Sequence, residues 1–319
     1  MNVTMMMKKK RWISLLLGIT LYSMNAHAGN VRAFADLLVW QASQETSSMW
    51  ATVITSPRFG TINFDPSNVD FSWRSGFRGG FLYEPKEGFF EPSVTWTYVP
   101  TSKSVREYPG GKFILPEPFS GYVSGDNFEG AYLNWQLIMN ALDLKISHLL
   151  NITPDFDLRP AIGIKGASIL QHMKTQWIRS DYTALDSIHN NFYGAGPELG
   201  LDAFWNITSH LYLQGNLSTA FMWGRWNIQD VYQRPAVASQ SITATRITTN
   251  MSNAQLGTLM LDYFLGMGWH QEGRIPWSFK LGYEVQHWPH QARWDSFQQL
   301  PVHGDLTFQG ATCGVSVDL

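Results

Sequence analysis

Charged side chains recur at even spacings within several stretches of the chain that are otherwise apolar or uncharged. The residues with this spacing are Arg74, Arg78, Glu91, Asp143, Lys145, Asp157, Arg159, Lys165, Glu198, Asp202, Asp262, Lys280 and Glu284. A period of two is the period of a β-strand, because successive side chains point to opposite faces. Charges of both signs on one face can pair across a narrow interior, or they can line a polar path for small solutes. The residues themselves leave both interpretations open.

The stretch WSFKLGYEVQHW, residues 277–288, shows the strand pattern most clearly. Its apolar face carries Trp277, Phe279, Leu281, Tyr283 and Val285, and its other face carries Ser278, Lys280, Gly282, Glu284 and Gln286. Roughly nine to eleven tilted residues cross a bilayer, and aromatic residues gather at both membrane–water interfaces. The length and the aromatic ends therefore favour a strand that spans a membrane. A half-buried strand of a soluble sandwich is the alternative.

The composition favours a surface that faces lipid. Charged residues make up 15% of the 319 residues, against about a quarter in a typical soluble domain, and the chain holds 14 Trp. A formal net charge of −2 argues against a nucleic-acid partner, which would need a basic face. The single cysteine, Cys313, excludes an internal disulfide and any multi-cysteine metal site. We predict no cofactor and no metal, since the histidines show no metal-ligand spacing.

The first 28 residues have the features of a cleaved signal peptide. A basic run from Lys8 to Arg11 precedes a short apolar run, residues 12–24, and Ala26 and Ala28 fit the small-x-small cleavage rule. An uncleaved anchor helix is the alternative. No later run approaches about eighteen apolar residues, so an exported chain of this kind can span a membrane only as a closed barrel. We therefore divide the chain into a signal peptide, 1–28, and a barrel domain, 29–319.

The connections between predicted strands alternate in length. Short turns lie near residues 86, 152, 208 and 274, and long segments cover 45–70, 100–127, 179–190, 228–254 and 289–303. Outer-membrane barrels have short periplasmic turns and long external loops. The sequence thus predicts an all-β fold, a transmembrane antiparallel up-and-down β-barrel of about ten strands, with eight or twelve as alternatives. The predicted location is the bacterial outer membrane.

Two predicted strands change the parity of their apolar residues. In residues 129–149, Leu133, Trp135, Leu137 and Met139 are followed by Leu142, Leu144 and Ile146. A β-bulge near Asn140 would explain this change. In the last strand, Leu306 and Phe308 oppose Ala311, Cys313, Val315, Val317 and Leu319, which predicts a bulge or a lumen-facing aromatic near Gln309. This last strand must pair with the first to close the barrel.

Several segments resemble the Legionella-type major outer membrane protein family. They are FRGGFLYEP (77–85), VTWTYV (94–99), ALDLKIS (141–147), LRPAIGIKGA (158–167), FYGAGPELGLDAFW (192–205), LYLQGNLSTAFMWGRWNI (211–228) and LTFQGATCGVSVDL (306–319). The ordered set covers nearly the whole mature chain. The resemblance implies a pore-forming protein of the bacterial outer membrane. Such barrels usually end in an aromatic residue, whereas this chain ends in Leu319.

We expect a porin-like function, with the thirteen charged residues lining the lumen. A plugged barrel that acts as a structural protein or adhesin is the alternative, and a barrel hydrolase is a further one. His189 with Asp186, and His290 with Asp295, are the groups such an enzyme would use, but no motif supplies a nucleophile, so we predict no enzyme. The expected partners are outer-membrane lipid and the barrel-assembly machinery. A homo-oligomer and a host-surface ligand for loops 100–127 and 228–254 stay open.

Overall fold

The computed structural model describes residues 29–319, apart from 49, 59–60, 87–89, 111, 117–127, 238–243 and 295–301. The predicted signal peptide, 1–28, lies outside the described residues. Within the described part of the chain, no helix is long and apolar enough to cross a membrane.

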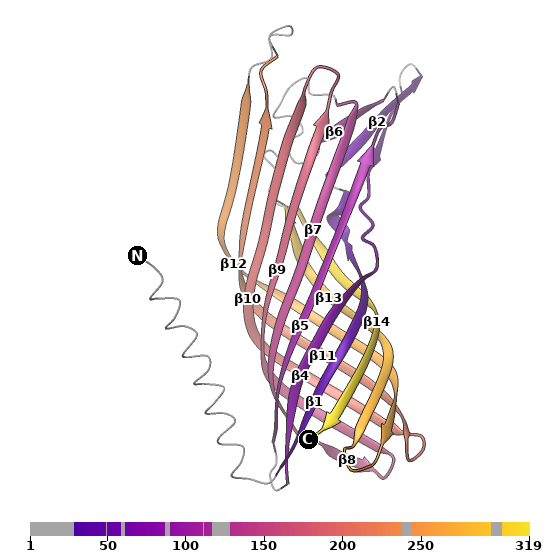
Figure 1. Cartoon of the computed structure of the whole chain (residues 1–319). Coiled ribbons are helices and arrows are strands. Elements are labelled where there is room, and N and C mark those ends of the chain that lie inside the picture. The colour runs from indigo at the N-terminus through magenta and orange to yellow at the C-terminus, as the bar shows by residue number, and fades with distance from the viewer. Residues whose placement is uncertain are drawn as a thin grey trace.

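Ten strands form a closed antiparallel barrel, as predicted (Figure 1). They are β1 (Gly29–Gln44), β4 (Arg74–Pro85), β5 (Glu91–Glu107), β7 (Gly130–Ser147), β9 (Phe156–Ile178), β10 (Thr183–Asn206), β11 (Leu211–Arg234), β12 (Thr245–Gln271), β13 (Trp277–Trp294) and β14 (Val302–Asp318). The last strand pairs with the first, from Arg32↔Asp318 to Gln44↔Leu306. This pairing closes the barrel and confirms the predicted role of the C-terminal strand.

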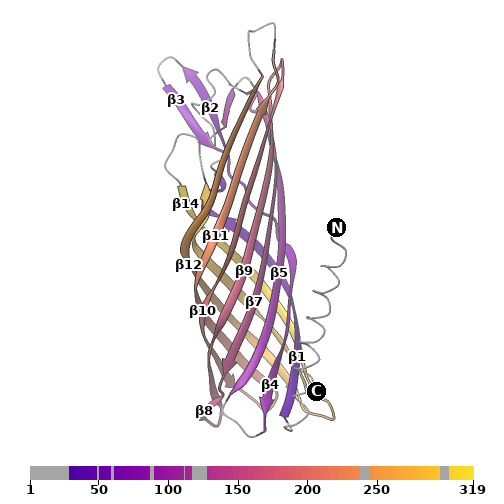
Figure 2. The ribbon, with the colours of Figure 1, turned by 90° about the vertical axis from the view of Figure 1, so that its left-hand side faces the viewer.

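The remaining elements lie at the two ends of the barrel. A small sheet with the order β3-β2-β6 consists of β2 (Ala51–Arg58), β3 (Thr61–Pro66) and β6 (Phe113–Pro116), and a 3-10 turn, η1, covers Glu45–Ser48. At the opposite end, β8 (Leu150–Thr153) pairs with the beginning of β9 (Figure 2). We call the end with the small sheet external, since outer-membrane barrels carry their long connections there.

Several strands are much longer than the sequence pattern predicted. Strands β9 to β12 have 23, 24, 24 and 27 residues, more than twice the roughly nine to eleven that cross a bilayer. Only residues 179–182 connect β9 to β10, and residues 235–244 connect β11 to β12. The loops predicted at 179–190 and 228–254 are therefore wrong over most of their length. These strands rise above the external ends of β1 and β14 (Figure 1).

The parity change in β7 does not come from a bulge. Its pairing with β5 and with β9 runs without interruption through Asn140, which lies opposite Tyr98 and Ser168. Leu142 and Leu144 face outward, with exposed fractions of 46% and 51%, whereas Leu137 and Met139 are fully buried inside. The predicted bulge is therefore wrong. The side chains alternate regularly, and the polarity of the two faces inverts along the strand.

This inversion divides the barrel into two halves. In the lower half apolar side chains point outward, as lipid requires, and polar ones point inward. In the external half the outward face is polar and the inward face is apolar, as in a water-soluble protein. The last strand follows the same rule, since Leu306 and Phe308 are buried inside while Val315 is exposed outside. Its pairing continues through Gln309 on both sides, so the lumen-facing aromatic is the correct alternative there.

An apolar core fills the external half of the barrel. Its largest fully buried side chains are Trp40, Trp50, Trp135, Trp177, Trp226, Trp288, Tyr232, Phe71, Phe128, Phe192 and Phe308. Three of these, Trp50, Phe71 and Phe128, belong to segments outside the barrel strands. Phe71 packs edge-on against Trp135, with ring centroids 5.2 Å apart, and Trp50 and Phe128 pack against Trp177 at 5.9 and 5.6 Å. The external connections thus contribute side chains to the interior.

Candidate functional site

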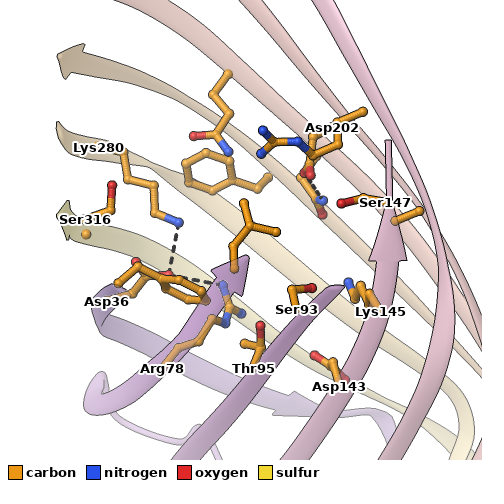
Figure 3. Close-up of a pocket in the computed structure, with 18 of the residues that line it drawn as sticks. Asp36, Arg78, Ser93, Thr95, Asp143, Lys145, Ser147, Asp202, Lys280 and Ser316 are labelled. Atoms are coloured by element: carbon orange, nitrogen blue, oxygen red, sulfur yellow. Dashed lines mark hydrogen bonds and ion pairs between the residues drawn. The ribbon is translucent and has the colours of Figure 1, made fainter. Parts of the chain in front are cut away.

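A cavity of about 250 Å³ lies in the lower half of the barrel, and all ten barrel strands contribute residues to it (Figure 3). Nine of the thirteen predicted lumen residues line this cavity: Arg78, Asp143, Lys145, Arg159, Lys165, Asp202, Asp262, Lys280 and Glu284. Because a closed barrel turns one face of every strand inward, residues far apart in the sequence meet there.

The other four predicted residues lie outside the cavity lining. Glu91 and Glu198 are joined to the cavity lining by ion pairs, Glu91 with Arg159 and Glu198 with Lys145 and Lys165. Asp157 is half-buried at the beginning of β9, opposite Phe204 on β10. Arg74 is exposed at the first residue of β4, so the structure does not bring it together with the others.

The first ion-pair group joins β1, β4 and β13. The Arg78 guanidinium donates to both carboxylate oxygens of Glu284, with Nη1 3.0 Å from Oε2. Lys280 Nζ lies 3.1 Å from Asp36 Oδ2, and Arg78 Nη1 lies 3.7 Å from the same oxygen. Figure 3 shows Lys280 and Arg78 approaching Asp36 from different sides. Both carboxylates are almost fully buried, so their charges depend on these partners.

The second group joins β7, β9 and β10. Lys165 donates to Asp143 and lies 3.5 Å from Glu198 Oε1. Lys145 Nζ lies 3.0 Å from the same glutamate oxygen. Glu198 is 1% exposed and Lys165 is 2% exposed, so removing one of them would leave a buried charge without its main partner.

The third group lies at the periplasmic end of the cavity. Arg32 lies 2.7 Å from Asp318 and 3.1 Å from Glu84. Arg159 lies 3.3 Å from Glu84 and 3.0 Å from Glu91. This group joins the first strand to the last and so supports the closure of the barrel.

The sequence pattern missed Arg32, Asp36 and Glu84. Four consecutive apolar residues, 37–40, hid the parity of the first strand. The even spacing from Arg32 to Asp36 was the signal that would have placed both on the inward face. Glu84 lies next to the short turn predicted near residue 86, whereas β4 continues to Pro85.

Carboxylates outnumber cations in and around the cavity. The cations are Arg32, Arg78, Lys145, Arg159, Lys165 and Lys280, and the carboxylates are Asp36, Glu84, Glu91, Asp143, Glu198, Asp202, Asp262, Glu284 and Asp318. Asp202 accepts a hydrogen bond from Asn216, and Asp262 Oδ1 has no hydrogen-bond partner within the described residues. The excess of negative charge would favour cations over anions in this space.

Apolar side chains bound the cavity on its external side. Further along the inward faces of the strands lie Leu38, Met139, Ile169, Met222, Met260 and Phe308, each no more than 1% exposed. Leu38 follows Asp36 by two residues, and Met260 precedes Asp262 by two. The apolar core therefore begins directly at the external end of the charged cavity.

A pair of buried acids lies in the external half, beyond the membrane-spanning part. Asp186 and Asp230 are 3% and 1% exposed on adjacent strands, in a diagonal arrangement. Burial and the neighbouring Asp230 raise the pKa of Asp186 well above its usual range. His189 has the opposite parity from Asp186 and lies in register with His172 on the outer face. His189 and Asp186, the first pair that a hydrolase would use, therefore point to opposite faces of the sheet and do not meet.

The other hydrolase pair includes Asp295, which lies outside the described residues. Across the described residues, no cluster of three or more His, Cys, Asp and Glu side chains could hold a metal ion.

Comparisons with known proteins give one family and several solved structures. The family model described as the Legionella pneumophila major outer membrane protein precursor matches residues 27–319. No curated protein matches the chain. The outer membrane protease OmpT from Escherichia coli is 11% identical with a TM-score of 0.46, and the match covers 91% of this chain and 97% of that one. The translocator domain of the autotransporter NalP from Neisseria meningitidis is 11% identical with a TM-score of 0.36, over 97% of both chains. A Pseudomonas aeruginosa FadL homologue is 8% identical with a TM-score of 0.26, over 91% and 90%.

Proposed function

This chain belongs to the Legionella major outer membrane protein family and is a β-barrel of the outer membrane, and from that premise we propose that it forms a pore for ions or small polar solutes. The observation that carries the proposal is the charged cavity lined by all ten strands. Fixed charges on the inner wall are the means by which pores attract and select hydrated solutes. The excess of carboxylates points to cations as the preferred solutes.

The apolar core favours a second candidate, a closed barrel that acts through its external segments. The side chains of Trp40, Trp135 and Phe308 are buried in the interior beyond the cavity. In the described arrangement an ion would have to cross this apolar layer. A closed barrel would make the ion-pair groups structural, holding the strands together without conduction.

Single-channel recording in planar bilayers distinguishes the two candidates. A pore gives discrete conductance steps, and a salt gradient gives a reversal potential of the sign expected for cation preference. Phe308→Ala removes a bulky side chain from the interior beyond the cavity, so it should enlarge the conductance if the core limits passage. Phe81→Ala is the matched control, since Phe81 is 54% exposed on the outer face.

The folded state of each variant is checked by its heat-dependent migration in gels, because Phe→Ala in a core costs about 3–5 kcal/mol. Folded wild type and folded Phe308→Ala that both fail to give steps would refute the pore and support the closed barrel. Equal conductance changes in Phe308→Ala and Phe81→Ala would mean that the core does not limit passage.

We also propose that the chain is not an enzyme, which the opposite faces of Asp186 and His189 support. Assays of the purified barrel with peptide and ester substrates test this, and turnover that is lost in His189→Ala would refute it. Delivery by the barrel-assembly machinery, self-association and binding of a host-surface ligand remain proposals that follow from the family and from the long external segments.

A further inference from the structure

The outward face of the external half has an uneven distribution of charge. On β5, β7 and β9 to β12, the Arg, Lys and His residues that point outward beyond the apolar band are Arg106, His172, Lys174, His189, Arg225 and Arg246. Among the described outward positions of these strands there is no Asp or Glu. We call these six residues the basic face.

The cations of the basic face lack carboxylate partners. No described carboxylate lies within 4.0 Å of Arg106, Lys174, Arg225 or Arg246, and Arg106 packs over the ring of Tyr132 at 5.1 Å. By contrast, every cation of the cavity has at least one carboxylate partner. On the neighbouring strand β13, the outward His287 lies 3.4 Å from Asp305. The basic face thus has charge available for an external anion.

A hollow of about 350 Å³ adjoins these cations between β10, β11 and β12. It is lined by His189, Asn191, Asn227, Ile228, Gln229, Asn250 and Met251. Four of these side chains are amides, which donate and accept hydrogen bonds at once. Such a lining suits phosphate oxygens and sugar hydroxyls better than an apolar ligand.

The basic face begins where the apolar band ends. Trp223 and Tyr193 are the last outward Phe, Tyr or Trp side chains on β11 and β10, with exposed fractions of 61% and 48%. Arg225 lies directly opposite Tyr193. Since a strand rises about 3.3 Å per residue, Arg225 sits roughly 7 Å beyond Trp223, and His189 roughly 13 Å beyond Tyr193. Aromatic residues mark the membrane–water interface, so these groups lie at the level of lipid headgroups.

We propose that the basic face binds the phosphate groups of anionic lipids in the outer leaflet. The acyl chains would lie against Trp223 and Tyr193, and Arg225, opposite Tyr193, would pair with the phosphate nearest to them. Lys174 lies opposite Ser187, six residues farther along the strands, roughly 20 Å, so it would pair with a second phosphate of the same headgroup layer, while the hollow takes the attached sugar or glycerol. Basic residues at a membrane surface attract anionic headgroups, and charge-assisted hydrogen bonds to phosphate are strong. The contact with the apolar band points to a lipid rather than to a soluble anion. This binding does not depend on whether the lumen conducts.

The test uses the full mature chain in nanodiscs of zwitterionic lipid. The probe is a diphosphorylated glucosamine disaccharide lipid, compared with the same lipid after removal of its phosphates, and native mass spectrometry counts the bound molecules. The double variant Lys174→Glu/Arg225→Glu should bind the phosphorylated lipid at least about tenfold more weakly. Arg274→Glu is the matched control, because Arg274 is exposed in the turn at the opposite end of the barrel. It should bind like the wild type.

Three results would overturn the proposal. They are equal binding of the phosphorylated and dephosphorylated lipids, an equal loss in Arg274→Glu, and displacement of the lipid by an equal concentration of inorganic phosphate, which would indicate a site for soluble anions. Heat-dependent gel migration verifies assembly. If the double Glu variant does not assemble, Lys174→Gln/Arg225→Gln removes the same charges with a milder change, and unchanged binding in that variant would equally refute the proposal.

Discussion

Leu281→Arg tests which face of the barrel contacts lipid and at what depth. Leu281 is the middle one of five outward residues on β13, from Trp277 to Val285, and it is 53% exposed. It lies between Met267 and Cys313 on the neighbouring strands. A position at the centre of the apolar band should therefore lie near the bilayer midplane.

The expected cost follows from that depth. An arginine on the lipid face costs about 2–4 kcal/mol at the midplane and about 0–1 kcal/mol near an interface. Leu281→Arg should therefore change the unfolding equilibrium constant roughly 30- to 900-fold, and Val285→Arg much less. Gln214→Arg is the matched control on the inward face, where Gln214 lines the cavity and an added cation meets an excess of carboxylates.

Urea unfolding of the three variants in lipid vesicles, followed by tryptophan fluorescence, measures these differences. Leu281→Ala separates the loss of the leucine from the cost of the charge. Equal destabilisation by Leu281→Arg and Gln214→Arg would mean that the two faces are wrongly assigned. Equal effects of Leu281→Arg and Val285→Arg would mean that the depth is wrong.

The signal peptide, the last strand, Cys313 and Asp186 each allow a further test. The mature chain should start at Gly29, and N-terminal sequencing of outer-membrane material that retained Lys8 to Arg11 would contradict this. Deleting residues 311–319 should abolish accumulation in the outer membrane, because β14 pairs with both β13 and β1. Leu319→Phe should leave this accumulation unchanged or improve it. Fractionation and immunoblotting measure the accumulation of both variants. Cys313 should react with lipid-soluble thiol reagents alone, since it lies between the outward Leu37 and Leu281; rapid labelling of intact barrels by a charged, impermeant reagent would place it in the lumen. The pKa of Asp186 is raised in the folded state, so its contribution to the free energy of unfolding falls as pH rises from the usual aspartate range towards the raised value. Asp186→Asn should therefore make the midpoint of urea unfolding less dependent on pH. An unchanged pH profile in this variant would argue against the burial of Asp186.

The alternation of side chains was enough to predict the barrel and its membrane-spanning faces. Residues 277–286 of β13 show why: the outward residues there are all apolar and the inward residues are polar or glycine, so the period of two is visible without any knowledge of neighbours. The same alternation singled out the charged residues that line the cavity, such as Lys145 and Asp262. Their even spacing is sufficient because a closed barrel sends one parity inward.

The external half could not be predicted in the same way, because the polarity of the faces inverts there. In β7 the apolar residues move from the outward positions 142–146 to the inward positions 133–139, which in a sequence looks the same as a bulge. Beyond the apolar band, the outward positions of β11 and β12 are mostly Asn, Gln, Thr and Arg, which look like a loop. The difference between a loop and a solvent-exposed strand lies in the partner strands, and the sequence of one strand does not contain them.

The sequence also missed charged residues whose inward orientation is visible only from their ion-pair partners. Asp36 is recognisable as an inward residue from its ion pairs with Arg78 and Lys280, which lie 42 and 244 residues away in the chain. The apolar run that follows it gives no parity of its own. Arg74, in contrast, has the expected parity but lies at the start of its strand and is exposed.

Depth measurements along β7 test whether the polarity of the two faces inverts along a continuous strand. Single cysteines are placed in a Cys313→Ala background at the outward positions 134, 136, 142 and 144 and at the inward position 137, and each carries a fluorescent label. Quenchers in the lipid should reach labels at 142 and 144, soluble quenchers should reach labels at 134 and 136, and neither should reach a label at 137. If lipid quenchers reach position 137 while 136 is shielded, the strand contains a bulge, its register differs from the one described, and the two-part barrel is wrong.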